Sequence, residues 1–425
     1  MRGSEVTAPR RAKNPVGRDA KSELPAPRNS PSMPQPYQAA ARTSPPERRR
    51  PGTEKPVMHN GTPQALGYRM PAEWEPHEGT WLIWPHDDTY AGTQQRLEHT
   101  WLAITMALHQ HERVHLILAN ERLRDHLQHQ MRYYGVIEGN IDAHIIPTDD
   151  VWARDCGPIF LMNAQGDLCV TAWNFNGWGE RYSYQQDRLV ATRVADVLSL
   201  PLFTAPITLE GGAIEVNGKG TLIATRSSIH NPNRNPGKDR ALIEEAIKGY
   251  LGVDHIIWLS GASREFCDAV GSDTDLHVDG YARFTDETTI LYSWTDDETD
   301  VFYPVLERHR DELQDAKIES GIALSLVPLP KPKNQMYSTL DPSRLPPFKS
   351  TPSLATYANF YVANNVVLVP VYGDVNDARA KSIIAEQFPS REIIGIPAWA
   401  MAELGGMVHC VTQQQPAGRM QRDRL

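Results

Sequence analysis

The sequence is poor in cysteine and lacks long apolar runs. Its 425 residues include only four cysteines, none of them in a C-x-x-C pair: Cys156, Cys169, Cys267 and Cys410. So few thiols exclude a disulfide scaffold and make a reducing, cytoplasmic compartment the simplest expectation. No stretch approaches the roughly 18 apolar residues that a membrane-spanning helix needs, so we expect no membrane partner.

Large apolar residues are also scarce in residues 1–57, which hold 11 of the 33 prolines and 12 Lys and Arg against 5 Asp and Glu. Such a segment cannot bury enough surface to offset its ordering entropy, which predicts a disordered tail. It has no apolar core of a secretory signal. Residues 58–425 are expected to form a single folded domain, with 31 basic against 47 acidic side chains. This acidic surplus argues against nucleic acid and favours a small cationic ligand.

Strand-like and helix-like patterns alternate along the rest of the chain. Two or three strands and one helix follow one another several times, which predicts a repeated α/β architecture, although no repeat is visible in the residues themselves. The predicted strands are 80–84, 114–119, 143–147, 158–162, 170–175, 213–216, 221–225, 255–259, 277–284, 288–294 and 393–396, with a hairpin at 360–372. The predicted helices are 94–109, 122–134, 187–200, 239–251, 305–318 and 376–388, and 328–352 is predicted to be a surface loop.

One short motif points to a different chemistry. His111-Glu112-Arg113-Val114-His115 matches H-E-x-x-H, in which two histidines on one helix bind zinc and the glutamate activates water. The helical pattern ends near His109, however, and Val114 opens a strand-like run, so the two histidines are expected on different elements. We therefore expect no metal, and a zinc peptidase remains a remote alternative.

Four other places carry reactive side chains. Asp155 lies before a Gly-Pro turn, Glu210 precedes two glycines, and His277 and Asp279 are placed by strand spacing on one face. Cys410 follows Gly405-Gly406 in a run predicted to be β-like. Each has an ordinary structural explanation, since a lone cysteine is usually a small buried apolar residue and a lone carboxylate often pairs with a nearby base.

Together these residues suit attack by sulfur on a planar cation. A guanidinium carbon is a poor electrophile, so an enzyme must fix its plane, balance its charge and supply a strong nucleophile. Carboxylates match the guanidinium fork, and a thiolate is the best side-chain nucleophile near neutral pH. A histidine can protonate the departing nitrogen and then activate water.

These motifs, taken in order from about residue 66 to 416, resemble the agmatine deiminase family, which is related to bacterial-type peptidylarginine deiminases. The ordered set is far more specific than any one member. The segments that carry the resemblance are Tyr68-Arg69-Met70-Pro71, 152–158, Leu209-Glu210-Gly211-Gly212, His277-Val278-Asp279, 372–377 and 405–416.

The resemblance implies a pentein fold, an α/β-propeller of five ββαβ-type units around a pseudo-fivefold axis. It also implies hydrolysis of a guanidino group to a ureido group and ammonia, without metal or organic cofactor. For agmatine the product is N-carbamoylputrescine, which belongs to polyamine biosynthesis. A homo-oligomer of this chain is compatible with these expectations.

The resemblance also implies roles for single residues. Cys410 would attack the guanidino carbon to form an amidino-cysteine, with His277 as general acid and then general base. Asp155 and Asp279 would hold the guanidinium, and Glu210 would hold that group or the histidine. Trp152 would pack along the aliphatic stem of the substrate.

Three departures concern the far end of the substrate. Leu66 replaces an aspartate of agmatine-specific relatives, Asp273 replaces a glutamate and is assigned to substrate binding, and Leu276 replaces a glycine. A deiminase of peptidyl-arginine or another guanidine, an amidinotransferase, and a non-catalytic binding protein on the same fold therefore stay open as alternatives.

Overall fold

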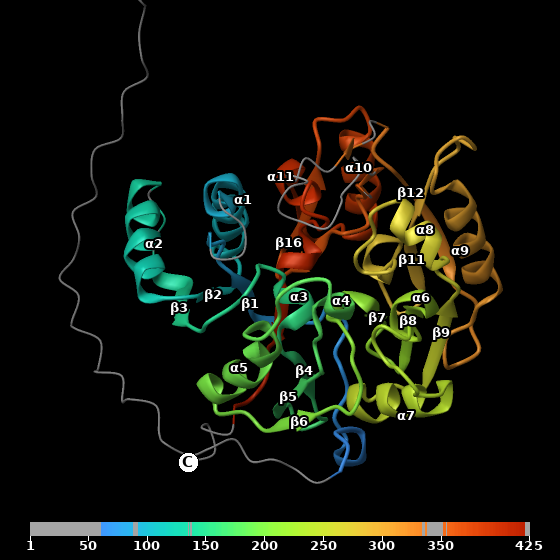
Figure 1. Cartoon of the computed structure of the whole chain (residues 1–425), viewed down its shortest axis with the longest axis horizontal. Coiled ribbons are helices and arrows are strands. Elements are labelled where there is room, and N and C mark those ends of the chain that lie inside the picture. Colours follow the sequence, from blue (N-terminus) through green and yellow to red (C-terminus); the bar gives the residue numbers. More distant parts are fainter. Residues whose placement is uncertain are drawn as a thin grey trace, which may run out of the picture. The chain divides into compact units, whose positions relative to one another are not determined.

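The structure is a computed structural model, and it describes residues 61–87, 92–134, 136, 138–333, 336–337, 352–353 and 355–420. These residues belong to one compact unit (Figure 1). The predicted disordered tail 1–57 and its boundary with the domain lie outside the described residues. Among the described residues, no helix combines the length and the apolar character needed to cross a membrane.

Four sheets share one plan: two antiparallel strands, a helix, and a third strand parallel to the second. Each helix crosses over to the third strand, as parallel pairing requires. These units are β4 (Ile159–Met162), β5 (Leu168–Ala172), α5 (Val190–Leu198) and β6 (Leu202–Thr204); β7 (Ile214–Val216), β8 (Thr221–Thr225), α7 (Arg240–Leu251) and β9 (His255–Leu259); β10 (Ala282–Phe284), β11 (Thr289–Trp294), α9 (Tyr303–Asp315) and β12 (Ser325–Pro330); and β15 (Tyr361–Ala363), β16 (Val366–Val371), α10 (Asp377–Gln387) and β17 (Glu392–Pro397).

The fifth unit joins two segments that are far apart in the sequence. Strand β18 (Gln413–Pro416) pairs antiparallel with β1 (His77–Ile83), and α1 (Thr93–Leu108) leads to β2 (Arg113–Leu118), parallel to β1. Helix α2 (Glu121–Tyr133) and strand β3 (Ile141–Ile145) extend this sheet. The predicted pentein of five ββαβ-type units is confirmed, and Figure 1 shows its sheets around the short helix α3 (Ala153–Cys156).

Local sequence explains where the helices lie and end. Helix α7 begins after Asp239, whose side chain accepts the backbone N–H of Leu242 at 2.8 Å, and ends at Gly252 with φ 66°. Helix α5 places Val190, Val194 and Leu198 on one buried face, as the 3.6-residue period requires. Strand β16 is apolar throughout and almost wholly buried, because the helices of the units cover the sheets.

Three predicted elements differ from the structure. Residues 277–284 were expected to be one strand, but only β10 is a strand, because Asp275 and Leu276 have φ values of 55° and 66° and turn the chain into a 3-10 turn first. The predicted helix 187–200 starts with a separate 3-10 turn. The predicted loop 328–352 starts inside β12, where Pro328 and Pro330 are tolerated at the edge of the sheet.

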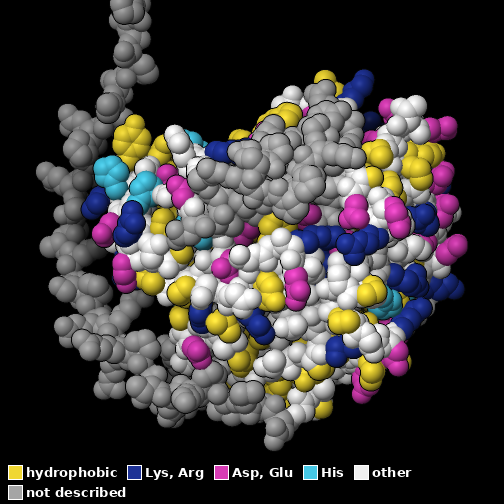
Figure 2. Space-filling view, viewed as in Figure 1, with side chains coloured by type: hydrophobic (Ala, Val, Ile, Leu, Met, Phe, Trp, Pro, Cys, Tyr) yellow, Lys and Arg dark blue, Asp and Glu magenta, His cyan; other side chains and the backbone are white. Residues whose placement is uncertain are grey.

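The remaining elements are short. They include turns between sheets and one isolated pair of strands: η1 (Gln64–Leu66), η2 (Glu138–Asn140), α4 (Gly177–Glu180), η3 (Asp187–Leu189), η4 (Gly211–Ala213), α6 (Arg226–Ile229), α8 (Arg264–Ala269), η5 (Val278–Gly280), β13 (Met336–Tyr337), β14 (Pro352–Ser353), α11 (Trp399–Ala402) and η6 (His409–Val411). Over the described part of the face in Figure 2, acidic and basic side chains are interspersed. That part of the surface is therefore not dominated by one sign of charge.

Candidate active site

The predicted reactive residues occupy similar places in the five units. In each unit a short helix, turn or bend precedes the first strand, with a polar side chain on it or directly next to it: α3 before β4, η4 with the preceding Glu210 before β7, η5 before β10, the bend at residues 357–358 with the following Asn359 before β15, and η6 before β18. Helix α3 contacts η4 and η6, and η4 contacts η5. The fold thus brings together residues that are up to about 250 positions apart, because β18 at one end of the domain pairs with β1 at the other.

Cys410 lies in this group of turns. Its Sγ is 3.4 Å from Asn359 Oδ1 and 3.9 Å from Asp279 Oδ2. It is partly exposed, whereas the three other cysteines are buried. The predicted β-like run is wrong here, because the backbone N–H of Thr412 donates to the His409 carbonyl at 3.1 Å and closes a 3-10 turn.

His277 lies just before η5 with its ring between two carboxylates. Its Nδ1 is 3.7 Å from Asp155 Oδ1, and its Nε2 is 3.5 Å from Glu210 Oε2. These distances are too long for good hydrogen bonds, and both His277 Nε2 and Glu210 Oε2 are buried without a hydrogen-bond partner. The imidazole is therefore available to a molecule that enters the site.

Three of these side chains converge on Gly212, in η4. A methyl group on Gly212 would lie 2.8 Å from both Asp155 Oδ1 and His277 Nδ1 and 3.0 Å from Asp279 Oδ2. His277 and Asp279 thus point to one place, as predicted, although they reach it from a 3-10 turn and not from a strand. Asp155 is held by two donors, Gly212 N at 3.0 Å and Trp178 Nε1 at 2.9 Å.

Burial and neighbouring charges set the protonation of the carboxyl groups. Burial raises the pKa of Asp155, even though the nearby His277 opposes it. Burial also acts to raise the pKa of Glu210, but Arg234 Nε, 2.6 Å from Glu210 Oε1, brings this pKa to about 2 together with His277. Glu210 is therefore ionised. A cation bound beside Asp155 would favour ionisation of that carboxyl group against the effect of burial.

The pKa values of His277 and Cys410 are both raised. Burial acts to lower the pKa of His277, but the carboxylates of Asp155 and Glu210 prevail and raise it. Burial, Asp279 and Asp155 all raise the pKa of Cys410 well above its ordinary value. Without a bound cation, the Cys410 thiol is therefore neutral, and the two carboxylates favour the protonated form of His277.

A cavity leads to Cys410 from the side of Trp152, whose ring packs against Gly406. Its wall is aromatic and acidic, with no Lys or Arg among its described residues, and includes Asp150, Trp152, Asp155, Trp178, Tyr182, Asp273 and Cys410. Asp273 accepts the hydroxyl of Tyr182 at 2.6 Å, and burial raises the pKa of Asp150 to about 7. A second cavity, beside His277, Tyr281 and Asn359, also reaches Cys410.

Sequence reasoning missed several residues of the site. Asn359 contacts Cys410, Trp178 holds Asp155, and Arg234 holds Glu210. Asn359 reads as an ordinary turn residue in the sequence. Its place just before the first strand of a unit is the signal that would have identified it, because similar places in other units are occupied by the predicted residues.

The zinc-like motif does not form a zinc site. His111 and Glu112 lie in the turn before β2 and His115 lies on β2, so the two histidines do not share a helix. Glu112 accepts Asn364 N at 2.8 Å and contacts Thr80, which gives it a structural role. No group of three or more potential metal ligands occurs among the described residues.

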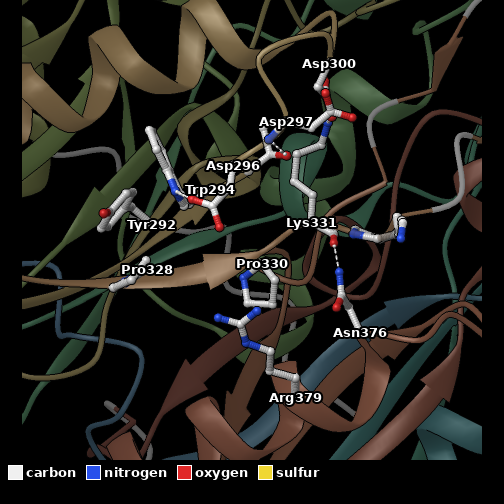
Figure 3. A pocket seen from close by; sticks show the side chains of 13 residues that line it. Tyr292, Trp294, Asp296, Asp297, Asp300, Pro328, Pro330, Lys331, Asn376 and Arg379 are labelled. Carbon is white, nitrogen blue, oxygen red and sulfur yellow. Dashed lines mark hydrogen bonds and ion pairs between the residues drawn. The ribbon is translucent and has the colours of Figure 1, made fainter.

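Two other places are outside the site. Leu66 is on η1, which packs against α7, and it does not line either cavity at Cys410. Figure 3 shows a separate cavity between β11, β12 and α10, where Lys331 Nζ is 2.6 Å from Asp300 Oδ2 and Asn376 Nδ2 donates to the Lys331 carbonyl at 2.8 Å. It contains no Cys or His among its described lining residues.

Comparisons with known proteins show which family the chain resembles. A family model described as Porphyromonas-type peptidyl-arginine deiminase matches residues 69–416. The agmatine deiminase of Pseudomonas aeruginosa strain LESB58 is 33% identical over 375 residues, which cover 84% of this chain and 98% of that protein. The solved agmatine deiminase of Enterococcus faecalis superposes with a TM-score of 0.77 at 26% identity, over 85% of this chain and 99% of its own. A variant agmatine deiminase of C. jejuni, solved with substrate bound, gives a TM-score of 0.71 at 27% identity, over 83% and 97%.

Proposed function

The chain belongs to the Porphyromonas-type peptidyl-arginine deiminase family, as a hydrolase that deiminates guanidino groups, and on this basis we propose that it converts agmatine to N-carbamoylputrescine and ammonia. The observation that carries the proposal is the convergence of Asp155, Asp279 and His277 on Gly212, next to the Cys410 thiol. Two carboxylates can hold the fork of a guanidinium in one plane.

Substrate binding prepares the nucleophile. In the empty site Asp155 and Asp279 oppose ionisation of Cys410. A guanidinium between these carboxylates neutralises their charge and favours the thiolate, so the thiol proton is lost to solvent as the cation binds. The substrate thus activates the group that attacks it.

The first half of the reaction forms a bond and releases ammonia. The Cys410 thiolate adds to the guanidino carbon, and the C=N electron pair moves to nitrogen. His277 gives its proton to one terminal nitrogen, the C–N bond breaks, and ammonia leaves an amidino-cysteine. The raised pKa of His277 favours the protonated imidazole before this proton is transferred to the departing nitrogen.

The second half reverses the role of the histidine. Neutral His277 takes a proton from water as its oxygen adds to the amidino carbon. The C–S bond then breaks, the thiolate is restored, the remaining hydroxyl proton is released to solvent, and the product leaves with a C=O group in place of C=NH₂⁺. Glu210 keeps the imidazole in place and stabilises its charge through the 3.5 Å contact with Nε2.

The cavity favours a substrate with a second cation. Asp150 and Asp273 line it, burial raises the pKa of both, and its described wall offers neither Lys nor Arg. A distal ammonium would match these acids, whereas the carboxylate of arginine would meet no positive partner. The rings of Trp152 and Trp178 suit an apolar stem between the two cationic ends.

A panel of substrates tests the proposal. Ammonia release should be measured with agmatine, free arginine, a C-terminal arginyl peptide and n-butylguanidine, which lacks the ammonium. We expect agmatine to have the highest kcat/KM, and Cys410→Ala to abolish turnover while agmatine still binds. Preference for an arginyl peptide would overturn the choice of substrate, and near-normal activity of Cys410→Ala would overturn the mechanism.

A further inference from the structure

A second histidine, His409, lies between two buried carboxylates directly before the nucleophile. Its Nδ1 is 2.8 Å from Asp279 Oδ2, and its Nε2 is 2.8 Å from Glu73 Oε2. All three side chains are at least nine-tenths buried. The reaction scheme above uses Asp279 but assigns no role to His409 or Glu73.

Counting protons shows that the three groups act as a unit. A neutral imidazole has one N–H, so one ring nitrogen would meet a carboxylate lone pair to lone pair at 2.8 Å. Either both ring nitrogens are protonated, or one carboxyl group carries the proton. In both arrangements the set of Glu73, His409 and Asp279 has a net charge of −1, with an N–H or O–H on each contact.

Neighbouring groups fix this set in place. Arg154 Nη2 lies 3.3 Å and Arg283 Nη2 2.9 Å from the Glu73 carboxylate, and the backbone N–H of Val362 donates to it at 2.8 Å. Arg154 Nε also donates to the His409 carbonyl at 3.3 Å. Asn359 accepts the backbone N–H of His409 through its side chain at 3.0 Å.

The pKa directions of the two carboxylates agree with bonds donated by His409, whereas the direction for His409 itself opposes its protonation. Burial acts to raise the pKa of Asp279, but its bond from His409 lowers it. Burial likewise acts to raise the pKa of Glu73, but Arg283 and His409 hold it well below the ordinary value. Burial, Arg154 and Arg283 lower the pKa of His409 against the pull of the carboxylates.

We propose that His409 is a positioning residue that keeps Asp279 ionised and oriented toward Cys410 and the incoming guanidinium. The idea rests on the proposed function for the identity of the ligand. Asp279 Oδ2 is the oxygen that His409 holds and also the one 3.9 Å from Cys410 Sγ. A histidine that only filled the core would not need a hydrogen bond to Asp279 Oδ2.

Two substitutions separate the two ring contacts. In His409→Asn the amide nitrogen takes the place of Nδ1 and can still donate to Asp279, while the contact with Glu73 is lost. In His409→Gln the amide nitrogen takes the place of Nε2 and can still donate to Glu73, while Asp279 loses its donor. A buried polar residue is replaced in both, so the cost of general misfit is matched. His309→Gln, at a buried histidine whose Nε2 accepts Gly261 N at 3.1 Å, is a control outside the site.

The decisive readout is agmatine affinity as a function of pH, measured by calorimetry in the Cys410→Ala background. Without its donor, Asp279 has a raised pKa, so the carboxylate that binds the cation is lost as pH falls. We expect His409→Gln to weaken binding about 30-fold at about pH 6 and less than about threefold at about pH 9. His409→Asn and His309→Gln should stay within about threefold at both values. Equal losses for the Asn and Gln variants, or a loss that does not depend on pH, would overturn the proposal.

A second measurement does not depend on the substrate. Carboxyl ¹³C-labelled aspartate allows the Asp279 resonance, assigned with Asp279→Asn, to be titrated in folded protein. It should titrate near neutral pH in His409→Gln and stay ionised over that range in His409→Asn. Unchanged titration in His409→Gln contradicts the role of His409, whereas failure of wild-type protein to deiminate any guanidine contradicts only the proposed function.

Discussion

The side-chain oxygen of Asn359 accepts the backbone N–H of Cys410 at 3.3 Å and lies 3.4 Å from the sulfur of the same residue. One amide thus fixes both the backbone and the thiol of Cys410. Because this amide is neutral, it orients the sulfur without adding to the negative charge of Asp155 and Asp279 around it.

Replacing Asn359 should therefore separate geometry from charge. Asn359→Asp keeps an acceptor of the same shape but adds a third negative charge beside Cys410, which raises the pKa of the thiol further. We expect alkylation of Cys410 by iodoacetamide at about pH 8 to slow at least about tenfold in Asn359→Asp. Asn359→Ala removes the acceptor without charge and should lower kcat more than it slows alkylation. Equal alkylation rates in wild type and Asn359→Asp would contradict this account.

Asp155→Asn should weaken capture of the guanidinium. The amide still accepts Gly212 N but cannot balance the positive charge, and a bond to a charged group contributes about 1.5 to 3 kcal/mol, or roughly 10- to 150-fold in affinity. Burial raises the pKa of Asp155, so wild-type affinity should fall as pH drops through this raised value. Asp155→Asn should lack this component of the pH dependence in titration calorimetry.

Asp296→Asn is the matched control for that variant. Asp296 belongs to the separate cavity of Figure 3, where the Trp294 indole donates to it at 2.8 Å. Its replacement should leave agmatine affinity unchanged. Similar affinity in Asp155→Asn and Asp296→Asn would show that Asp155 serves only the fold.

Gly212→Ala should abolish turnover. The added methyl group would lie within 3.0 Å of Asp155, His277 and Asp279, which must then separate. Gly139→Ala is the control, because a methyl group there meets nothing within 4 Å. We expect at least about a 100-fold loss of kcat/KM in Gly212→Ala and no change in Gly139→Ala, with circular dichroism to verify that both are folded. An active Gly212→Ala would mean that the three side chains need not meet at this point.

Glu210→Gln should shift the pH dependence of turnover. Asp155 and Glu210 raise the pKa of His277, which in the proposed mechanism must be protonated for ammonia to leave. Removing the Glu210 charge lowers this pKa, so the alkaline limb of the kcat profile should move to lower pH. An unchanged alkaline limb would exclude His277 as the acid that this limb reports.

Much of the fold followed from local patterns. The hairpin predicted at 360–372 exists because Asn365, with φ 59°, tolerates the left-handed conformation between two apolar strands. The helices were found within a few residues because their apolar faces repeat with the helical period. The pairing of β1 with β18 left no local signal, since it depends on closure of the whole set of units.

The structure brings the predicted residues together, but their local placement was not predicted. The sequence predicts Cys410, His277 and the carboxylates as members of an ordered set. It does not predict that Cys410 and Asp279 lie on 3-10 turns, that His277 and Glu210 directly precede such turns, or that Asp155 lies on the short helix α3, because single polar residues between apolar ones resemble an alternating strand. Asn359 and His409 were missed since their roles come from partners that are distant in sequence: His409 meets Glu73 across 336 positions. Leu66, singled out for substrate recognition, lies on η1 against α7 instead.

The union of β1 and β18 has a consequence for the timing of activity. Cys410 is held by the turn that leads directly into β18, and β18 is fixed by its register with β1, which pairs Trp81 with Gln413. During synthesis His277 and the carboxylates of Asp155, Glu210 and Asp279 are all made well before Cys410. In a nascent chain the Cys410 thiol therefore reaches these side chains only when β18, the last of the described strands to be made, pairs with β1.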